Sequence, residues 1–415
     1  MTSKRNKSGM ARAQIQPPES NPYVAPSRRR LDPKLTGPAP SQVAIQAIEV
    51  CQAIQSIDGS VTLVADKATL VRVYIDQLTL ASGVRLAGEI KVRNSTGAPA
   101  TYVAALADVT VDPKATPTRL EQRNLIQSSL NFRLPSDATK TGKLLVEVNR
   151  IWLAGGSDLT VTGTKEASAT FVSAPPLRLR CIGLRYRDNA TGQAHAPDAV
   201  HFAYLRSFLE RAYPVPSVEW SQIVVDANFI APFNDQTVLK ANAQIAAIRS
   251  SEVNNGMDPR THYLALVDDA RGKNFMRGRA MGIPAAAAPD TVASSPCGVP
   301  NGFAGDNDLS YSDWYGAHEL GHTFGRYHPG FPRGAQDASD KDFPYQNGQL
   351  SNDDQKFVGY DLGDSTLGIP LQALSGTHHH DLMTYAERQW ICAHTFEAIR
   401  SRLIEEDEQF ALPIA

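Results

Sequence analysis

The sequence predicts a multidomain α+β protein, in which an all-β part is followed by a part that mixes strands and helices. Its 415 residues exceed what one ordinary hydrophobic core accommodates. Residues 42–174 show period-two alternation of apolar and polar side chains between turn residues. After the pair Pro175-Pro176, candidate strands and helices alternate along the chain. We therefore expect a boundary at this pair.

Composition and charge are typical of a globular protein and exclude several kinds of partner and site. The chain is 42% hydrophobic and 20% charged, as in globular proteins, and its net charge of -2 predicts neither nucleic acid nor an anionic membrane as a partner. No run reaches the ~18 apolar residues that span a bilayer. Four cysteines lie far apart without a CxxC pair, so a cysteine-built zinc site is not expected: Cys51, Cys181, Cys297 and Cys392. Their state, reduced thiols or one disulfide, stays open.

The composition of residues 1–40 predicts a disordered, proline-rich basic tail, because the segment contains eight Lys/Arg and only two acidic residues. No apolar core follows the basic start, so the tail does not resemble a secretory signal peptide. The run Arg28–Arg30 is a solvated charge run or, alternatively, an address, a processing site or a polyanion contact.

Residues 41–175 predict an immunoglobulin-like β-sandwich of half-buried antiparallel strands. Three runs carry the alternation, around residues 70–75, 85–93 and 144–148. This stretch offers no catalytic constellation.

Residues 176–415 predict a mainly parallel sheet covered by helices. We expect strands at 177–186, 218–225 and 263–267, and helices around 200–209 and 238–248. A further strand at 279–283 would form the sheet edge. The stretch 284–309 predicts a long loop, which is usually functional inside a compact domain.

The next segment, His318 to His328, carries the chemistry, with the sequence HELGHTFGRYH. Residues i and i+4 share one helix face, so His318 and His322 aim their rings at one point. Zinc accepts imidazole nitrogens at ~2.0–2.1 Å. Glu319, one step round the helix, reaches a metal-activated water without being a ligand.

A glycine explains how a third histidine becomes available. Gly325 can take positive φ and end the helix, after which the chain turns and His328 approaches from a third direction. Three histidines leave one zinc position open, as in catalytic sites. With 10 His and 29 Gly in the chain, a bare HExxH arises by chance in roughly 1% of such chains, and the full motif at on the order of 10⁻⁵.

The segment resembles the metzincin clan of zinc peptidases, whose motif HExxHxxGxxH is followed by a methionine turn. Met383, in Asp381-Leu382-Met383-Thr384-Tyr385, is the methionine that follows the motif. The resemblance implies that Met383 lies beneath the metal and that Tyr385 helps to bind the oxyanion. The alternative for Met383 is ordinary core packing, and the alternative for Tyr385 is a buried structural tyrosine.

The resemblance also implies an activity, a zinc-dependent endopeptidase that hydrolyses protein or peptide substrates by a metal-activated water. Glu319 is then the general base, one zinc ion the cofactor, and a C-terminal helix completes the fold. An N-terminal β-sandwich is similar to that of uncharacterised bacterial members. Extracellular export by a non-classical route is implied, with a cytoplasmic location as the alternative. Pro329 stands where the clan often has an acidic residue, so no subfamily is assigned.

Substrate contacts are expected at two places. Backbone groups of Ala280, Met281 and Gly282 would hold the substrate as an added strand. Residues 387–390 would shape the pocket for the residue that follows the cut.

Several alternatives stay open. The zinc could be inert within a protein- or glycan-binding module, or purely structural. Cys297 is a loop cysteine or a thiolate cap on the zinc, and the histidines at 378–380 face solvent or line the cleft. His201 and His262 are expected to be structural. Calcium sites at two acidic groups have no supporting loop pattern: Asp306, Asp308 and Asp313, or Asp353 and Asp354.

Overall fold

The structure is a computed structural model that describes residues 39–410 except 96, 98, 117, 190, 230–233, 235–237, 271–274, 301–305, 307 and 331–337. The predicted tail, with Arg28–Arg30, lies outside the described residues apart from Ala39 and Pro40. Pro40–Ala415 forms one compact unit. Helices and several sheets both occur, which confirms the α+β class. No helix among the described residues has the length and apolarity to cross a membrane.

Two sheets in the first part of the chain share one apolar core. The first has the order β10-β1-β4-β8, and the second has the order β3-β11-β9-β5-β6 with β7 beside β5. Val73, Ile90 and Val146, from three different strands, meet in that core. The bounds of these strands are β1 (Gln42–Cys51), β3 (Leu63–Val64), β4 (Leu70–Ile75), β5 (Arg85–Asn94), β6 (Thr101–Ala104), β7 (Val109–Thr110), β8 (Leu130–Arg133), β9 (Gly142–Leu153), β10 (Thr160–Gly163) and β11 (Glu166–Val172).

The prediction of a half-buried strand is wrong for β4, because every residue of β4 is buried. On its outer side, the Arg72 guanidinium donates to the carbonyls of Gln122, Arg123 and Leu125. Helix α1 (Arg119–Asn124), which supplies two of them, was not expected. The sequence does contain a pattern typical of a helix start, because Thr118 and Glu121 form a capping box.

The second part contains the predicted, mainly parallel sheet. Strands β14 (Val218–Asp226), β12 (Leu177–Arg187), β15 (His262–Asp268) and β17 (Ala293–Cys297) run parallel to their neighbours. Two short strands, β13 (Ala194–His195) and β16 (Arg279–Ala280), pair antiparallel. The edge strand is confirmed in β16, but it is shorter than the expected 279–283.

The predicted loop over 284–309 is wrong where β17 lies. Its sequence, Ala-Ser-Ser-Pro-Cys, shows no apolar periodicity. The strand forms because it pairs with β15, with Ala293 opposite Leu264 and Cys297 opposite Asp268. Pairing between strands distant in the chain is not encoded locally.

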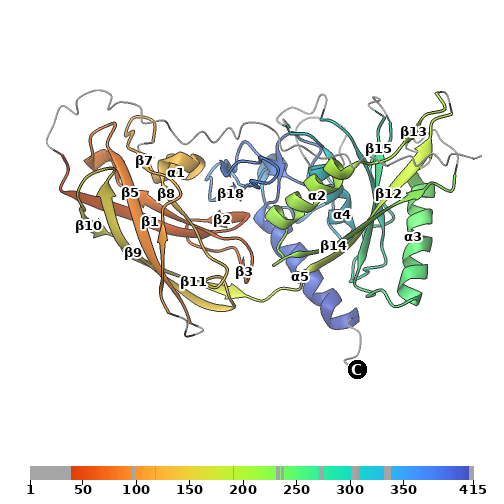
Figure 1. The fold of residues 1–415 in the computed structure, drawn as a ribbon, viewed down its shortest axis with the longest axis horizontal. Coiled ribbons are helices and arrows are strands. Elements are labelled where there is room, and N and C mark those ends of the chain that lie inside the picture. Colours follow the sequence, from red (N-terminus) through yellow and green to blue (C-terminus); the bar gives the residue numbers. More distant parts are fainter. Residues whose placement is uncertain are drawn as a thin grey trace, which may run out of the picture. The chain divides into compact units, whose positions relative to one another are not determined.

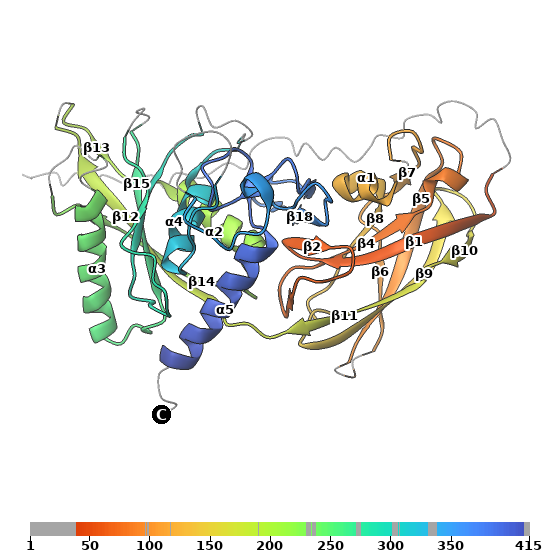
Figure 2. The same cartoon turned by 180° about the vertical axis from the view of Figure 1, so that it is seen from behind.

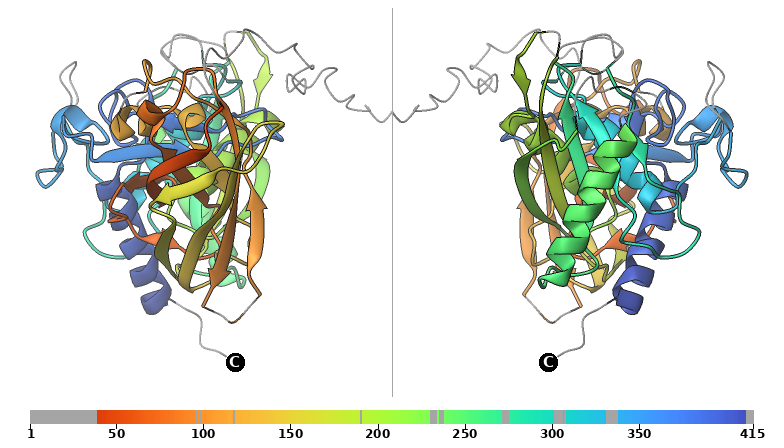
Figure 3. Two further views of the ribbon diagram at one scale, coloured as in Figure 1. Left: turned by 90° about the vertical axis from the view of Figure 1, so that its left-hand side faces the viewer. Right: turned by 90° about the vertical axis from the view of Figure 1, so that its right-hand side faces the viewer.

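Helices cover both faces of this sheet (Figure 1). Along β15, Leu264 and Leu266 pack in the core of α2 (Ala199–Ala212), α4 (Ser312–Thr323) and α5 (Ala393–Phe410). Tyr263, Ala265 and Val267 alternate with them and pack with α3 (Val238–Asn254). The right-hand view of Figure 3 shows α3 lying across the strands on its own face of the sheet.

The remaining elements connect the two parts of the chain. Strand β2 (Ile54–Ser56) pairs with β18 (Phe357–Asp361), which also pairs with β19 (Gln372–Leu374) (Figure 2). The Trp390 indole donates to the Ala53 carbonyl at 2.7 Å. The predicted division at residues 175 and 176 therefore stays a prediction within one compact unit. Short elements complete the fold: β20 (His380–Asp381), β21 (Gln389–Trp390), and 3-10 helices at Gln77–Thr79, Ile126–Ser128 and Gln346–Gly348.

Candidate metal centre

Helix α4 carries the candidate metal centre in a buried position. Its apolar residues Ala317 and Leu320 belong to the core below the sheet. Although they are polar, His318, Glu319 and His322 are only 3%, 4% and 6% exposed. Burying three such groups on one helix costs free energy unless they have partners. Their surroundings therefore show what the site can do.

Gly325 ends the helix as predicted, with φ at +79°. Its amide donates to the His322 carbonyl at 2.9 Å, and the Arg326 amide donates to the Gly321 carbonyl at 3.1 Å. This pair of hydrogen bonds is a Schellman motif. The chain then reverses and brings His328 back towards the helix.

The structure brings His318, His322 and His328 together. Their ligand atoms all lie within 4.8 Å of one another, and the Nε2 atoms of His318 and His328 are 3.2 Å apart. Two nitrogens bound at about 2.0–2.1 Å to a tetrahedral ion would stand roughly 3.4 Å apart. The spacing of the three rings therefore fits one small metal ion.

Backbone carbonyls set which nitrogen of each helix histidine faces the centre. His318 Nδ1 bonds to the Leu382 carbonyl, and His322 Nδ1 to the Arg326 carbonyl, each at 2.7 Å. Burial and the two neighbouring histidines hold the pKa of His318 well below its usual range, so its ring is neutral. A neutral ring that donates from Nδ1 presents the Nε2 lone pair, as metal-ligating histidines do.

A tight turn over Asp381–Thr384 lies against α4. The Thr384 amide donates to the Asp381 carbonyl at 3.0 Å, and the Asp381 carboxylate accepts the Met383 amide at 2.9 Å. Met383 is 1% exposed. A Cβ added to Gly321 would lie 2.5 Å from Met383 Sδ. The predicted methionine thus packs directly beneath the helix turn between the two histidines, in a place that only a glycine leaves open.

Glu319 is held by the edge of the sheet. Burial raises the pKa of Glu319 to about 8, against the opposing effects of a hydrogen bond from the Ala280 amide and of the Arg279 charge. The carboxyl also lies so close to the backbone of Gly278 that a Cβ there would collide with it. These contacts orient the side chain, and sequence reasoning missed Gly278 because no local pattern links it to the helix.

Tyr385 stands at the rim of the histidine group. Its ring centroid lies 5.5 Å from that of His318 and 4.9 Å from that of His328. The residue is 52% exposed and lines the cavity beside His318. The predicted place of Tyr385 beside the candidate metal centre agrees with these distances, and its role in binding the oxyanion stays a prediction.

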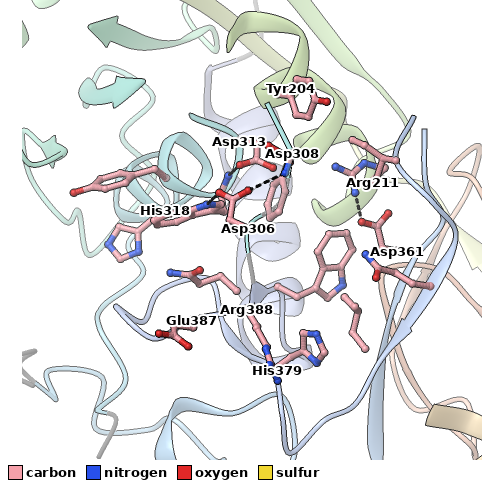
Figure 4. A pocket seen from close by; sticks show the side chains of 18 of the residues that line it. Tyr204, Arg211, Asp306, Asp308, Asp313, His318, Asp361, His379, Glu387 and Arg388 are labelled. Atoms are coloured by element: carbon pink, nitrogen blue, oxygen red, sulfur yellow. Dashed lines mark hydrogen bonds and ion pairs between the residues drawn. The ribbon is translucent and has the colours of Figure 1, made fainter. Parts of the chain in front are cut away.

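A cavity of about 1110 Å³ opens beside His318 and Tyr385. Figure 4 shows its walls, which include Asp306, Asp308 and Asp313 near the histidine and the ion pair of Arg211 with Asp361 farther in. Burial raises the pKa of Asp308 to about 6. The expected pocket residues 387–390 line this cavity, together with His379, while His378 is exposed. A cavity of this size accommodates a side chain or a small ligand.

The three expected substrate-binding residues lie along the β16 edge. The Met281 amide donates to the Val292 carbonyl at 2.8 Å, so it is directed into the sheet. Ala280 contacts Glu319, and nothing lies within 4 Å of the Cβ position of Gly282. The outer edge is thus formed by the alternate residues Ala280 and Gly282, and the Ala280 amide there already donates to Glu319.

Other predicted ligands do not join this centre. All four cysteines are free thiols and buried. Cys297 lies on β17 in a different group, with His201 and Asp268, and is not a cap on the three histidines. Two such groups occur among the described residues, and neither contains the aspartates suggested for calcium. His262 is buried as a structural residue would be, and its Nε2 atom lies 2.8 Å from a carboxyl oxygen of the buried Glu406.

Comparisons with known proteins add no family to this description. No protein-family model matches the chain, and no curated protein matches it significantly in sequence.

Proposed function

We propose that this protein is a zinc-dependent endopeptidase with a metzincin-like catalytic part preceded by an immunoglobulin-like β-sandwich. The observation that carries the proposal is the convergence of His318, His322 and His328 beside a buried carboxyl group, Glu319. Three imidazoles with one open position are the ligand set of catalytic zinc, whereas structural zinc usually has four protein ligands.

Each residue of the candidate site would have its own role in the hydrolysis. Zinc held by the three histidines would supply Lewis acidity, which makes water a competent nucleophile near neutral pH. Glu319 would accept the proton of the attacking water and deliver it to the leaving amine. The Tyr385 hydroxyl would donate a hydrogen bond to the oxyanion that develops from the scissile carbonyl.

Two features favour a peptide as the substrate. The outer edge of β16 would offer the Ala280 carbonyl and the main-chain groups of Gly282, to which an extended peptide would add as a strand. This edge holds Glu319, so a peptide bound there would pass over the metal centre. The cavity lined by Tyr385 and residues 387–390 would then receive one side chain of the peptide.

The test is digestion of a peptide library by the zinc-loaded full-length chain, with and without a chelator. Glu319→Gln should abolish cleavage and leave the zinc content unchanged, because Glu319 is not a ligand. Glu219→Gln, at a carboxylate whose side chain is 56% exposed, is the matched control and should cleave as the wild type does.

Two outcomes would refute the proposal. Full activity of Glu319→Gln would remove this residue from the reaction. If the wild type holds zinc but cleaves no peptide, a zinc-containing binding module for protein or glycan would replace the peptidase.

A further inference from the structure

A second group of metal-ligating side chains lies at the carboxyl ends of two parallel strands. Asp268 ends β15 and Cys297 ends β17, and these two residues are register partners. His201, from the first turn of α2, faces them. The imidazole, carboxylate and thiol ligand atoms all lie within 4.8 Å of one another.

A relay of hydroxyls sets the proton on the His201 ring. Ser312 Oγ donates to the His201 carbonyl at 2.8 Å, so its proton is used there. Ser310 Oγ, 2.7 Å from Ser312 Oγ, must then donate to Ser312. His201 Nδ1, 2.6 Å from Ser310 Oγ, must in turn donate to Ser310. When the ring is neutral, this relay places its one proton on Nδ1 and leaves the lone pair on Nε2.

That lone pair faces negatively charged groups. His201 Nε2 lies 3.8 Å from an oxygen of Asp198 and 4.0 Å from an oxygen of Asp268, beyond hydrogen-bond distance. The other Asp268 oxygen accepts the Ala270 amide at 2.7 Å, which orients the carboxylate. His201 is 5% exposed and Cys297 is fully buried. A cation placed among these groups would have a nitrogen, a carboxylate oxygen and a sulfur within reach.

We propose that His201, Asp268 and Cys297 form a second zinc site, separate from the three histidines. One thiolate, one imidazole and one carboxylate form a donor set that suits Zn²⁺ better than Ca²⁺ or Mg²⁺. The Cys297 thiol gives up its proton to solvent when the ion binds, and Asp198 or a water completes the shell. The hydrogen bonds to Ser310 and Ala270 are the outer partners that ligands of a metal usually have.

The ion would join elements that are distant in the chain. His201 belongs to α2, the two other ligands belong to the sheet, and Ser310 precedes α4 by two residues. Zinc there would fix the carboxyl edge of β15 and β17 against the start of the helix that carries His318. The role is structural and does not depend on hydrolysis.

Metal content is the first test. The full-length wild type, loaded with zinc and dialysed, should hold about two zinc ions per chain. The double variant His318→Ala/His322→Ala should keep about one, and so should Cys297→Ala. A wild type with one zinc ion that is lost in the histidine double variant would overturn the second site and leave the proposed peptidase intact.

Spectroscopy distinguishes the sites even if a cysteine variant fails to fold. In the His318→Ala/His322→Ala variant, the zinc X-ray absorption spectrum should contain a sulfur neighbour at about 2.3 Å. The cobalt-substituted variant should show a near-ultraviolet thiolate charge-transfer band. Adding Cys297→Ala should remove this band, and adding Cys181→Ala, at another buried cysteine, should keep it. A shell of nitrogen and oxygen alone, or occupancy by a metal other than zinc, would refute the assignment.

Discussion

Gly325→Ala tests whether the glycine turn builds the metal centre. Alanine in the left-handed region costs about 1–2 kcal/mol. The new Cβ would lie 2.6 Å from the Pro284 carbonyl oxygen, whereas ordinary contact begins at 3.4 Å, so the turn must move by roughly 0.8 Å. Such crowding adds about 1–3 kcal/mol. The ligand-competent turn is therefore destabilised by about 2–5 kcal/mol in total.

The consequence for zinc follows from the population of that turn. If the strained segment adopts another conformation, only a fraction of the molecules keeps the turn that positions His328. Zinc affinity then falls in proportion to that fraction, by about 30-fold or more. The assay is a competition titration of the metal-free protein against a chromogenic chelator. Urea unfolding in parallel measures the free energy of unfolding.

Gly155→Ala is the matched control. Gly155 has φ at +77°, and nothing lies within 4 Å of its Cβ position. This variant should lose about 1–2 kcal/mol of stability, with zinc affinity unchanged. If folded Gly325→Ala binds zinc within about threefold of the wild type, the turn does not position His328, and the reasoning fails.

Three further predictions concern other parts of the structure. Tyr385→Phe should lower kcat about 10²-fold with zinc affinity unchanged, and an unchanged kcat would contradict an oxyanion role. Burial lowers the pKa of Lys67 to about 7, below its unfolded value of about 10.4, so folding disfavours the charged amine. The contribution of Lys67 to the free energy of unfolding should therefore be lowest below pH 7 and rise from about pH 7 to 10. Lys67→Met should flatten this rise in urea unfolding, whereas Lys140→Met, at an exposed lysine, should not. Arg123→Met should cost about 3–5 kcal/mol of unfolding free energy, because Glu49, 2.8 Å away and 1% exposed, would stay buried without its cation. Adding Glu49→Gln should recover part of that loss, and no recovery would contradict the pairing.

Sequence reasoning reached the ligand set because the ligands are local. His318 and His322 are one helix turn apart, and Gly325 lies between them and His328. Helix spacing and glycine conformation act over a few residues, so a single sequence carries them. The turn at Asp381–Thr384 was predictable for a different reason, since a family pattern supplied the expected place of Met383.

The partners of these residues were not predictable. Ala280 meets Glu319 only because β16 pairs with β17, and β17 was taken for a loop. His201, Asp268 and Cys297 are separated by tens of residues, and only the parallel register of β15 and β17 brings two of them together. Register between distant strands is decided by tertiary packing, and the periodicity of one strand says little about it.

The same physical device occurs in both groups of ligands. Each buried imidazole is oriented by a hydrogen bond at Nδ1: His318 by the Leu382 carbonyl, His201 by Ser310. Leu382 is itself held, because the Asp381 carboxylate accepts the Met383 amide and the Cys392 amide at 2.9 and 3.0 Å. Buried polar groups are stable only when such chains of hydrogen bonds are complete. Both groups of side chains therefore need no exceptional residues, only neighbours whose hydrogen bonds leave one ring nitrogen available to a cation.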